Sequence, residues 1–180
     1  MATFTPPPIT LFFCVDIPDL LPLYKHAIER HNHSHLFETC PNAGFDLYFP
    51  KEEKLGVTNG INSYFFNLGV RAFMVRSNLK EDTEEHISFY MYPRSSLSGT
   101  PLMMSNHTGI IDSGFRGQIV AAVRNLAFAH ADCVIEKHVR LFQVCAPNLE
   151  RFVVKLLKPE DFDEFTKTER GEGGFGSTGV

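Results

Sequence analysis

The chain has 180 residues, of which 43% are hydrophobic and 21% are charged, and its formal net charge is −4 at pH 7. This length and composition indicate one globular domain with a sizeable core and exclude a disordered chain. The negative charge argues against a general nucleic-acid binder or a membrane-surface binder. No run approaches the ~18 apolar residues that span a bilayer. The N-terminus has no positive charge before its short apolar run, so we expect no signal peptide.

The four cysteines lie far apart in the sequence and form no C-x-x-C pair. This spacing favours reduced, packed thiols in a cytosolic type of compartment over a disulfide or zinc framework. The residues concerned are Cys14, Cys40, Cys133 and Cys145.

In chain order, the β-branched and aromatic residues of Ile9–Val15 predict a strand. Pro18 and Pro22 interrupt the segment that follows, and a short helix is predicted over 23–30. The remainder is predicted to be all-β, with polar connections over 51–60 and 78–85. Strands are expected within 41–50, in two pieces around Gly69 within 63–76, and over 86–92, 119–123, 133–135, 141–145 and 152–156. Strands at intervals of roughly ten residues are typical of a sandwich or barrel.

Three histidines, His31, His33 and His35, are spaced by two. On a strand this spacing would place three imidazoles on one face, where they could hold a metal ion. Their Asn and Ser neighbours favour a solvated loop instead.

The stretch 92–119 carries the residues best suited to bind a nucleotide. Arg94, Ser95 and Ser96 offer one cation and two hydroxyls, which suit phosphate oxygens. Asp112 follows two β-branched residues and precedes Phe115, with glycines at 109, 114 and 117 that permit tight turns or close approach to a ligand. Spacing alone leaves two interpretations open: a nucleotide site, or a plain β-hairpin with ordinary turn glycines.

The last eleven residues read R-G-E-G-G-F-G-S-T-G-V. A glycine-rich backbone around Arg170, Phe175, Ser177 and Thr178 suits the wrapping of a phosphate chain. A lone glycine-rich C-terminus is more often a frayed tail, but this tail and the Arg-Ser-Ser cluster call for the same ligand.

Five short motifs in fixed order resemble those of the trimeric dUTP pyrophosphatase (dUTPase) family. The motifs lie at 42–47, 93–96, 106–117, 140–143 and 170–179, so the stretch from the first to the last spans about three-quarters of the chain. The resemblance implies an all-β, distorted jelly-roll β-sandwich of the β-clip kind, assembled as a homotrimer with an exchanged C-terminal arm. Each active site would take the first, second and fourth motifs from one chain, the third from a second chain and the tail from a third.

The implied reaction is Mg²⁺-dependent hydrolysis of dUTP to dUMP and pyrophosphate, which keeps uracil out of DNA and supplies the precursor of dTMP. The resemblance implies a cytoplasmic protein, or a nuclear one if the source is eukaryotic or viral, with no nucleic-acid or membrane partner. Asp112 would activate the water that attacks the α-phosphorus, and Asp46 would hold Mg²⁺ through its waters. The substrate-binding residues would be Arg94, Ser95, Ser96, Asn106, Gly109, Ile111, Phe115, Gln143, Arg170, Phe175, Gly176, Ser177 and Thr178.

Several positions depart from the family pattern. Position 115 is Phe where Tyr is usual, so stacking on the deoxyribose is kept and a hydroxyl contact is lost. Phe142 replaces a usual Ala, and its volume must be absorbed by the packing near Gln143. We expect a single domain over 1–180, with 20–39 an insertion and 167–180 a flexible arm that closes a neighbouring site.

Two alternatives to an active dUTPase remain open. A dCTP deaminase of the same fold would need a catalytic Glu ten residues after Asp112, but that position is Ala122. A catalytically inactive, dUTPase-like interaction protein would be expected to lose Asp112, Arg170 or the tail serine, and all three are present.

Overall fold

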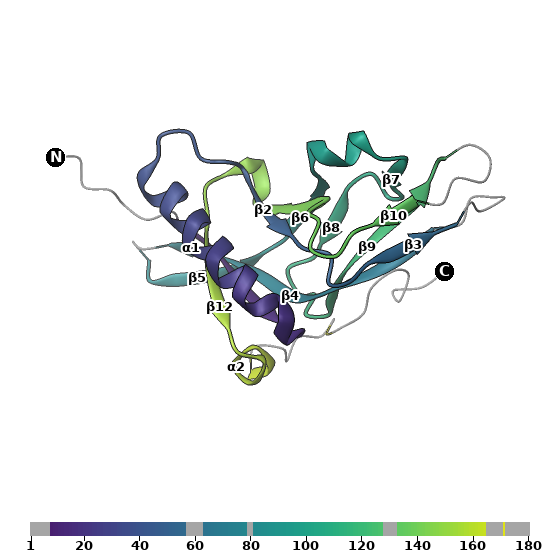
Figure 1. Cartoon of the computed structure of the whole chain (residues 1–180). Helices are drawn as coiled ribbons and strands as arrows, with labels where there is room; N and C mark the ends of the chain where they lie inside the picture. The colour runs from purple at the N-terminus through teal and green to yellow at the C-terminus, as the bar shows by residue number, and fades with distance from the viewer. Residues whose placement is uncertain (1–7, 57–62, 79–80, 128–132, 165–170, 172–180) are drawn as a thin grey trace.

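A computed structural model describes residues 8–56, 63–78, 81–127, 133–164 and 171. Strands dominate these residues, with one long helix near the start of the chain (Figure 1). The strands are β1 (Ile9–Val15), β2 (Gly44–Leu47), β3 (Glu53–Leu55), β4 (Tyr64–Asn78), β5 (Thr83–Ile87), β6 (Phe89–Pro93), β7 (Leu102–Met104), β8 (Gly109–Ile111), β9 (Gln118–Asn125), β10 (Cys133–Ile135), β11 (Phe142–Cys145) and β12 (Val153–Leu157). The helices are α1 (Leu21–Phe37) and α2 (Pro159–Glu164), with 3₁₀ turns η1 (Pro18–Leu20), η2 (Ser95–Gly99) and η3 (Pro147–Leu149).

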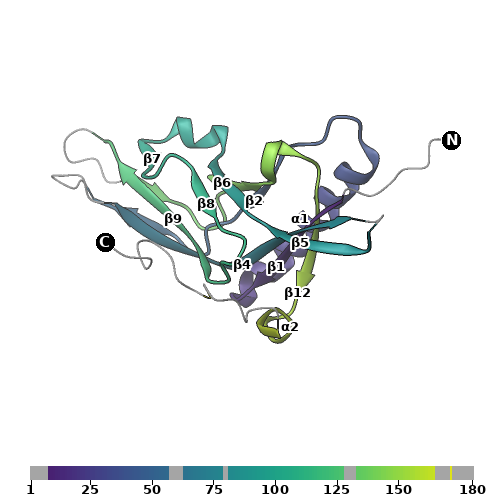
Figure 2. The same ribbon diagram turned by 180° about the vertical axis from the view of Figure 1, so that it is seen from behind.

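The strands form two main sheets and one small one. The largest sheet has the order β12-β1-β4-β9-β7, with β5 also paired to β4. A second sheet has the order β2-β11-β6-β8, and β10 pairs with β3. β4 runs through the middle of the fold in the view from behind (Figure 2). This arrangement confirms the predicted all-β, sandwich-like architecture.

The core lies between the two main sheets and under α1. Its buried side chains come from both sheets and from the helix, and they include Phe13, Tyr24, Phe45, Leu47 and Phe142. Phe13 contacts the rings of both Tyr24 and Phe45, at centroid distances of 4.9 and 5.3 Å. Aromatic pairs of this kind add to the stabilisation from the buried area itself. Among the described residues, no helix is long and apolar enough to cross a membrane.

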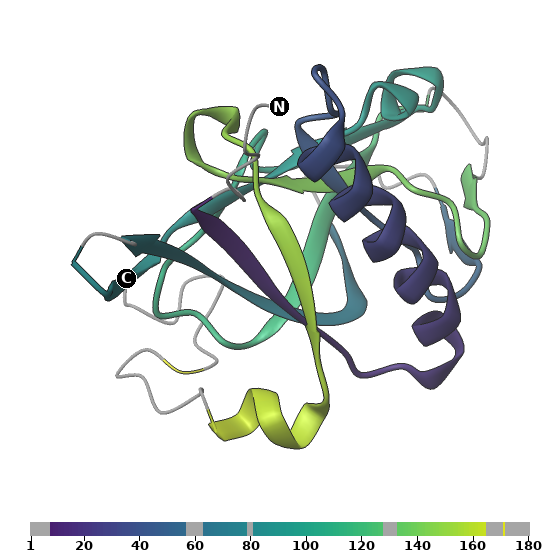
Figure 3. The same ribbon diagram turned by 90° about the vertical axis from the view of Figure 1, so that its left-hand side faces the viewer.

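Helix α1 is longer than the sequence predicts, and it contains the histidines that were expected in a solvated loop. Pro22 lies in the first turn of α1, where proline is tolerated because the missing N–H would have no partner within the helix. Tyr24, Ile28, His31 and His35 follow at intervals of three or four residues and are all buried. They therefore form one face of an amphipathic helix. Figure 3 shows this helix lying beside β12, to which Asn32 donates a hydrogen bond at the Val154 carbonyl, 2.8 Å.

The prediction of polar connections over 51–60 and 78–85 is wrong in part. β3 lies inside the first segment and pairs with β10, and Leu55 is its one fully buried side chain. β5 begins inside the second segment and pairs antiparallel with the end of β4. The strand predicted over 86–92 is two strands, since Ile87 ends β5 in the large sheet and Phe89 begins β6 in the other.

The two apolar pieces around Gly69 belong to one strand, β4. Its register to β9 shifts between Asn67 and Arg71, which marks a bulge. Gly69 has φ of 68°, and a Cβ at this position would overlap the side chain of Ile17. Both features require glycine at the bulge.

The stretch around Asp112 is not the β-hairpin that was considered. β8 pairs with β6, whereas β9 pairs with β4 and β7. The turn between β8 and β9 therefore carries the chain from one sheet to the other, and Asp112 stands at the start of this turn.

Candidate active site

Asp46 stands at the centre of a charged cluster built from three strands. It lies on β2 directly opposite Gln143 of β11. Its Oδ1 accepts from Arg94 Nε at 2.7 Å, and its Oδ2 accepts from Arg140 Nη1 at 3.0 Å. Arg94 follows β6, the other neighbour of β11. The pairing of β2, β11 and β6 therefore brings the first, second and fourth sequence motifs together.

The backbone around Arg94 is fixed by residues that precede β11. The Arg94 N–H donates to the Leu141 carbonyl at 2.8 Å, and Arg94 Nη1 donates to the Arg140 carbonyl at 2.8 Å. The Ser96 hydroxyl also donates to the Arg140 carbonyl, at 3.0 Å. Ser96 thus braces the loop in this structure, while Ser95 lines the adjacent pocket.

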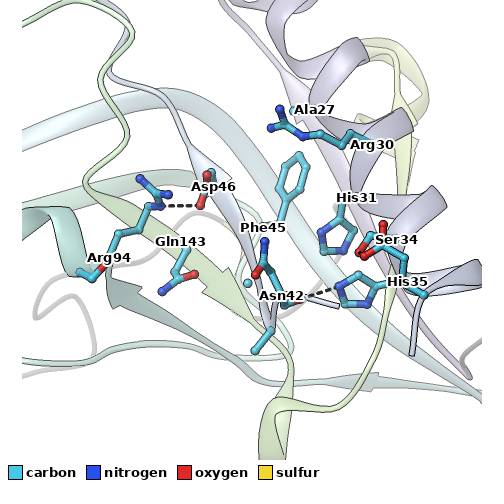
Figure 4. A pocket seen from close by; sticks show the side chains of 14 residues that line it. Ala27, Arg30, His31, Ser34, His35, Asn42, Phe45, Asp46, Arg94 and Gln143 are labelled. Carbon is cyan, nitrogen blue, oxygen red and sulfur yellow. Dashed lines mark hydrogen bonds and ion pairs between the residues drawn. The ribbon is translucent and has the colours of Figure 1, made fainter. Parts of the chain in front are cut away.

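That pocket has a volume of about 530 Å³ and lies between the strands and α1 (Figure 4). Its strand side includes Asp46, Arg94, Ser95 and Gln143. Its helix side is lined by Ala27, Arg30, His31, Ser34, His35 and Glu38, and the segment Asn42–Phe45 joins the two sides. The sequence predicted site residues on the strand side and none on the helix side. Four of the six helix-side residues lie beyond residue 30, where the predicted helix ends.

Gln143 reaches across Gly44 toward the start of the Arg94 loop. Its Nε2 donates weakly to the Pro93 carbonyl at 3.4 Å, and a Cβ on Gly44 would overlap its carboxamide. Phe142, the neighbouring departure from the family pattern, points the opposite way. It is fully buried, and its ring lies 6.2 Å from that of Phe49. The core therefore absorbs the volume of Phe142, and Gln143 keeps its place in the pocket wall.

His31 and His35 form a stacked pair beneath the pocket, with ring centroids 3.9 Å apart. His35 Nδ1 accepts from the Phe152 N–H at 3.2 Å, which leaves Nε2 to donate to the Asn42 carbonyl at 2.7 Å. Burial and then the proximity of His35 lower the pKa of His31 to about 3. Burial also lowers the pKa of His35. Both rings are therefore neutral packing elements at physiological pH.

The histidines do not form a metal site in this structure. Both nitrogens of His35 are engaged by the backbone, and His33 lies on the exposed side of α1. Across the described ranges, no group of three or more His, Cys, Asp or Glu side chains is placed to hold a metal ion.

The third motif lies far from this pocket along the same strand. Ile111 pairs with Phe89 at the start of β6, and Ser113 N–H donates to the Ser88 hydroxyl at 3.1 Å. Arg94 is five residues further along, which corresponds to about 17 Å at the rise of an extended strand. Accordingly, Asp112 is not among the residues that line the pocket beside Arg94.

The substrate-binding residues predicted in the third motif have varied surroundings. Asn106 is exposed in the turn after β7, Ile111 and Phe115 are half-buried, and the Phe115 N–H donates to the Asp112 carbonyl at 2.9 Å. Gly109 is buried, and a Cβ there would lie 3.2 Å from side-chain atoms of Met91 and Met104. Packing inside the chain is therefore sufficient to explain this glycine.

Arg116 was not predicted as a site residue, yet it holds the turn that carries Asp112. It is 1% exposed, and its guanidinium donates to the carbonyls of Ser113 and Phe115 at 2.7 and 2.8 Å. It also contacts His86 Nδ1 at 3.1 Å and lies 4.6 Å from the centre of the Phe73 ring. Burial and the Arg116 charge lower the pKa of His86, so the neutral ring accepts this hydrogen bond.

Most of the C-terminal arm lies outside the described residues, including Arg170, Phe175, Gly176, Ser177 and Thr178. Gly171 is described, and its carbonyl accepts from the Arg116 N–H at 2.9 Å. The start of the arm therefore reaches the turn that follows Asp112.

Comparison with known proteins decides the family. A protein-family model described as dUTPase matches residues 33–179. The chain belongs to the dUTPase family. The match begins within α1, so most of the predicted 20–39 insertion precedes it.

Relatives of known description agree with this assignment. The chain is 39% identical over 145 residues to a deoxyuridine 5'-triphosphate nucleotidohydrolase of Rickettsia felis, with 80% of this chain and 86% of the relative covered. It is 33% identical over 141 residues to the protein of the same description from Alkaliphilus metalliredigens, with 77% and 84% covered. Among solved structures, a Staphylococcus bacteriophage 80alpha dUTPase mutant with dUpNHpp is 21% identical, with 79% of this chain and 88% of that chain covered and a TM-score of 0.45.

In this dUTPase-family chain, Asp46 is the residue predicted to hold Mg²⁺ through water. Each of its carboxylate oxygens already accepts from one arginine. An ionised carboxylate offers about four acceptor positions, so two remain for water molecules. A hydrated Mg²⁺ that takes its inner ligands from phosphate and water fits this arrangement.

Proposed function

We propose that this chain is a dUTP diphosphatase that hydrolyses dUTP to dUMP and pyrophosphate. The observation that carries the proposal is the pocket wall in which Asp46, Arg94, Ser95 and Gln143 meet from three paired strands. A guanidinium, a hydroxyl and a carboxamide there suit phosphate oxygens, and the relatives are described as deoxyuridine 5'-triphosphate nucleotidohydrolases. Such an enzyme, in the cytoplasm or nucleus, keeps uracil out of DNA and supplies dUMP for dTMP synthesis.

Asp112 is the proposed base for the attacking water, which must stand in line with the α-phosphorus. The turn that carries Asp112 is held by hydrogen bonds from the buried Arg116. This support suits a catalytic carboxylate, since a base must keep a fixed geometry toward the reacting atoms. Phe115 would lie against the deoxyribose, and Asn106 with backbone groups of Gly109 and Ile111 would read the uracil edge.

A homotrimer is the proposed assembly, and the separation of Arg94 and Asp112 supports it. Asp112 follows Ile111, the partner of Phe89, so about 20 Å of extended strand separates it from Arg94, and we expect that one copy does not supply both to one substrate. A second copy that contributes its Asp112 turn beside the Arg94 pocket resolves the separation. The C-terminal arm of a third copy would then close the site, with Phe175 on uracil and Arg170, Gly176, Ser177 and Thr178 around the terminal phosphate. Such a lid would exclude water during the reaction.

Mg²⁺ is the proposed cofactor, held by the phosphates and by waters that donate to Asp46. When bound, it would neutralise charge on the triphosphate. Arg94 and Arg140 each donate to one carboxylate oxygen of Asp46. Together they hold the carboxylate in one orientation beside the pocket.

The position at which a related deaminase would need its catalytic acid is Ala122. It lies in β9, is 3% exposed, and its carbonyl accepts from the Ser105 N–H at 2.8 Å. A methyl group buried in the sheet does not transfer protons, so deamination is not proposed.

The experiment that tests the proposal is pyrophosphate release from dUTP, dCTP, dTTP and UTP, measured side by side with Mg²⁺ present. We expect rapid release from dUTP and rates at least a hundredfold lower with the others, since hydrogen-bond readout discriminates strongly. Ammonia release from dCTP would identify a deaminase instead. A chain that binds dUTP and releases nothing would be an interaction protein.

A further inference from the structure

Helix α1, most of which precedes the family match, also forms one wall of the pocket beside Arg94. Arg30 lines that pocket together with Arg94, Ser95 and Gln143. In the view of Figure 4, its guanidinium points away from the helix, on the side of the pocket where Asp46 lies.

Contacts along α1 show which part of the strand side Arg30 is level with. The helix runs antiparallel to the segment 42–48, since His35 contacts the Asn42 carbonyl and the Tyr24 hydroxyl accepts from the Tyr48 N–H at 2.9 Å. Between these two points, the His31 ring lies 5.3 Å from that of Phe45. Arg30, the residue before His31, is therefore level with Phe45 and Asp46.

Each acidic side chain that lines the pocket, and Arg94 as well, already has a partner within the chain. Asp46 is paired with Arg94 and Arg140, and Glu38 accepts from the Ser34 hydroxyl at 2.9 Å. Glu38 also lies eight residues beyond Arg30, which is about 12 Å along a helix axis. Arg30 is exposed, and no hydrogen bond or ion pair joins it to a residue of the described ranges, so its guanidinium is free to meet a ligand in the pocket.

The backbone from which Arg30 extends is anchored at several points. Asn32 exchanges two hydrogen bonds with the backbone of Val154, at 2.8 and 2.7 Å. The Arg151 guanidinium donates to three carbonyls at the C-terminal end of α1, those of His35, Glu38 and Thr39. Binding by a residue on such a helix orders its side chain but needs no rearrangement of the backbone.

From this arrangement we infer that Arg30 binds phosphate oxygens of the nucleotide, as an additional guanidinium beside Arg94 supplied by α1. The inference rests on the proposed function, because it assigns part of the same substrate to the helix. A guanidinium on a phosphate forms charge-assisted, often bidentate hydrogen bonds. The affinity that Arg30 adds should therefore grow with the number of phosphates on the ligand.

The test compares Arg30→Gln and Arg30→Lys with Lys25→Gln as a matched control. Lys25 is exposed on the same helix, does not line the pocket, and stands about 140° around the helix from Arg30. Binding of a non-hydrolysable dUTP analogue, dUMP and deoxyuridine is measured by calorimetry with Mg²⁺, and the KM for dUTP by pyrophosphate release.

For Arg30→Gln we expect the Kd of the dUTP analogue and the KM to rise about tenfold or more, as for the loss of a hydrogen bond to a charged group. The Kd of deoxyuridine should stay within twofold of wild type, Arg30→Lys should recover part of the loss, and Lys25→Gln should match wild type. An Arg30→Gln protein that binds the dUTP analogue as tightly as wild type overturns the role of Arg30 alone. A wild-type protein that binds no deoxyuridine nucleotide overturns the proposed function, and this inference with it.

Discussion

Arg94 and Asp112 lie at opposite ends of one antiparallel strand pair. Arg94 directly follows β6, whereas Asp112 directly follows Ile111, which pairs with Phe89 at the start of β6. Both residue types are needed for the proposed hydrolysis, one to bind phosphate and one to activate water. The fold of a single copy keeps them apart, and the account therefore depends on how copies of the chain meet.

Replacing Asp112 by Asn should reduce kcat for dUTP by about 10²–10⁴-fold, because the attacking water loses its base. The Kd of a non-hydrolysable dUTP analogue should change little, since the amide has nearly the same size and shape as the carboxylate. Asp161→Asn is the matched control, because Asp161 is exposed on α2, away from the pocket. Normal turnover by Asp112→Asn would place the base elsewhere.

Ending the chain at Glu169 should nearly abolish dUTP hydrolysis while the oligomeric state, measured by light scattering, stays the same. The proposed lid would exclude water and complete the site, and the buried core side chains of the described residues all precede it. A second truncation after Glu172 retains Gly171, whose carbonyl accepts from the Arg116 N–H, and still lacks Phe175, Ser177 and Thr178. Full activity in either truncated protein would refute the lid.

The free energy of unfolding should fall as the pH drops below about 6.5, the ordinary pKa of an unfolded histidine. The pKa of His31 is lowered to about 3 in the folded chain. Between about pH 6.5 and about pH 3 the unfolded chain therefore binds a proton at this histidine, and the folded chain does not. This histidine alone then lowers the free energy of unfolding by up to about 1.4 kcal/mol for each pH unit of acidification. Above pH 6.5 both states are neutral and its contribution is constant.

Urea unfolding of wild type and His31→Phe at several pH values from 7.5 to 4.5 measures this dependence. The groups that face His31 are His35 on the same helix and the rings of Phe45 and Phe152, so phenylalanine keeps the aromatic contacts. The variant should lose less stability on acidification, whereas His33→Gln on the exposed side of α1 should behave as wild type. Parallel curves for wild type and His31→Phe would mean that His31 titrates normally.

Replacing Phe142 by Ala, the usual residue of the family at this position, should destabilise this chain by about 3–5 kcal/mol. The ring is fully buried against Phe49, so its removal leaves a cavity. The KM for dUTP should stay near the wild-type value at a permissive temperature, because the ring faces away from Gln143. Phe65→Ala, at a site that is 58% exposed, serves as the control in chemical denaturation. An unchanged stability for Phe142→Ala would show that the core does not depend on this ring.

Local patterns in the sequence were sufficient to predict most strands. β1 and β10 were predicted with the bounds observed, because their apolar and β-branched residues are continuous. β3 was missed because it buries one leucine, Leu55, within a polar stretch, and its pairing with β10 depends on residues far away in the chain.

The predicted helix ends at residue 30, whereas α1 continues to Phe37. Two residues of its buried face are histidines, which count as polar in a search for apolar periodicity. Their burial depends on Phe45 and Phe152, which no local pattern reveals. The family motifs implied that one site contains Asp46, Arg94 and Gln143. The part of α1 in the same pocket, with Arg30, needed the tertiary structure.

The most direct test of the shared site is subunit complementation between two inactive variants, Asp112→Asn and Arg94→Ala. The two variants are co-expressed, the mixed oligomer is purified, and dUTP hydrolysis is measured per site. If each site takes Arg94 from one copy and Asp112 from a neighbour, random assembly should restore about a quarter of the wild-type rate. If both residues act from the same copy, every site carries one of the two defects and the mixture stays as inactive as its parents, which would contradict the account.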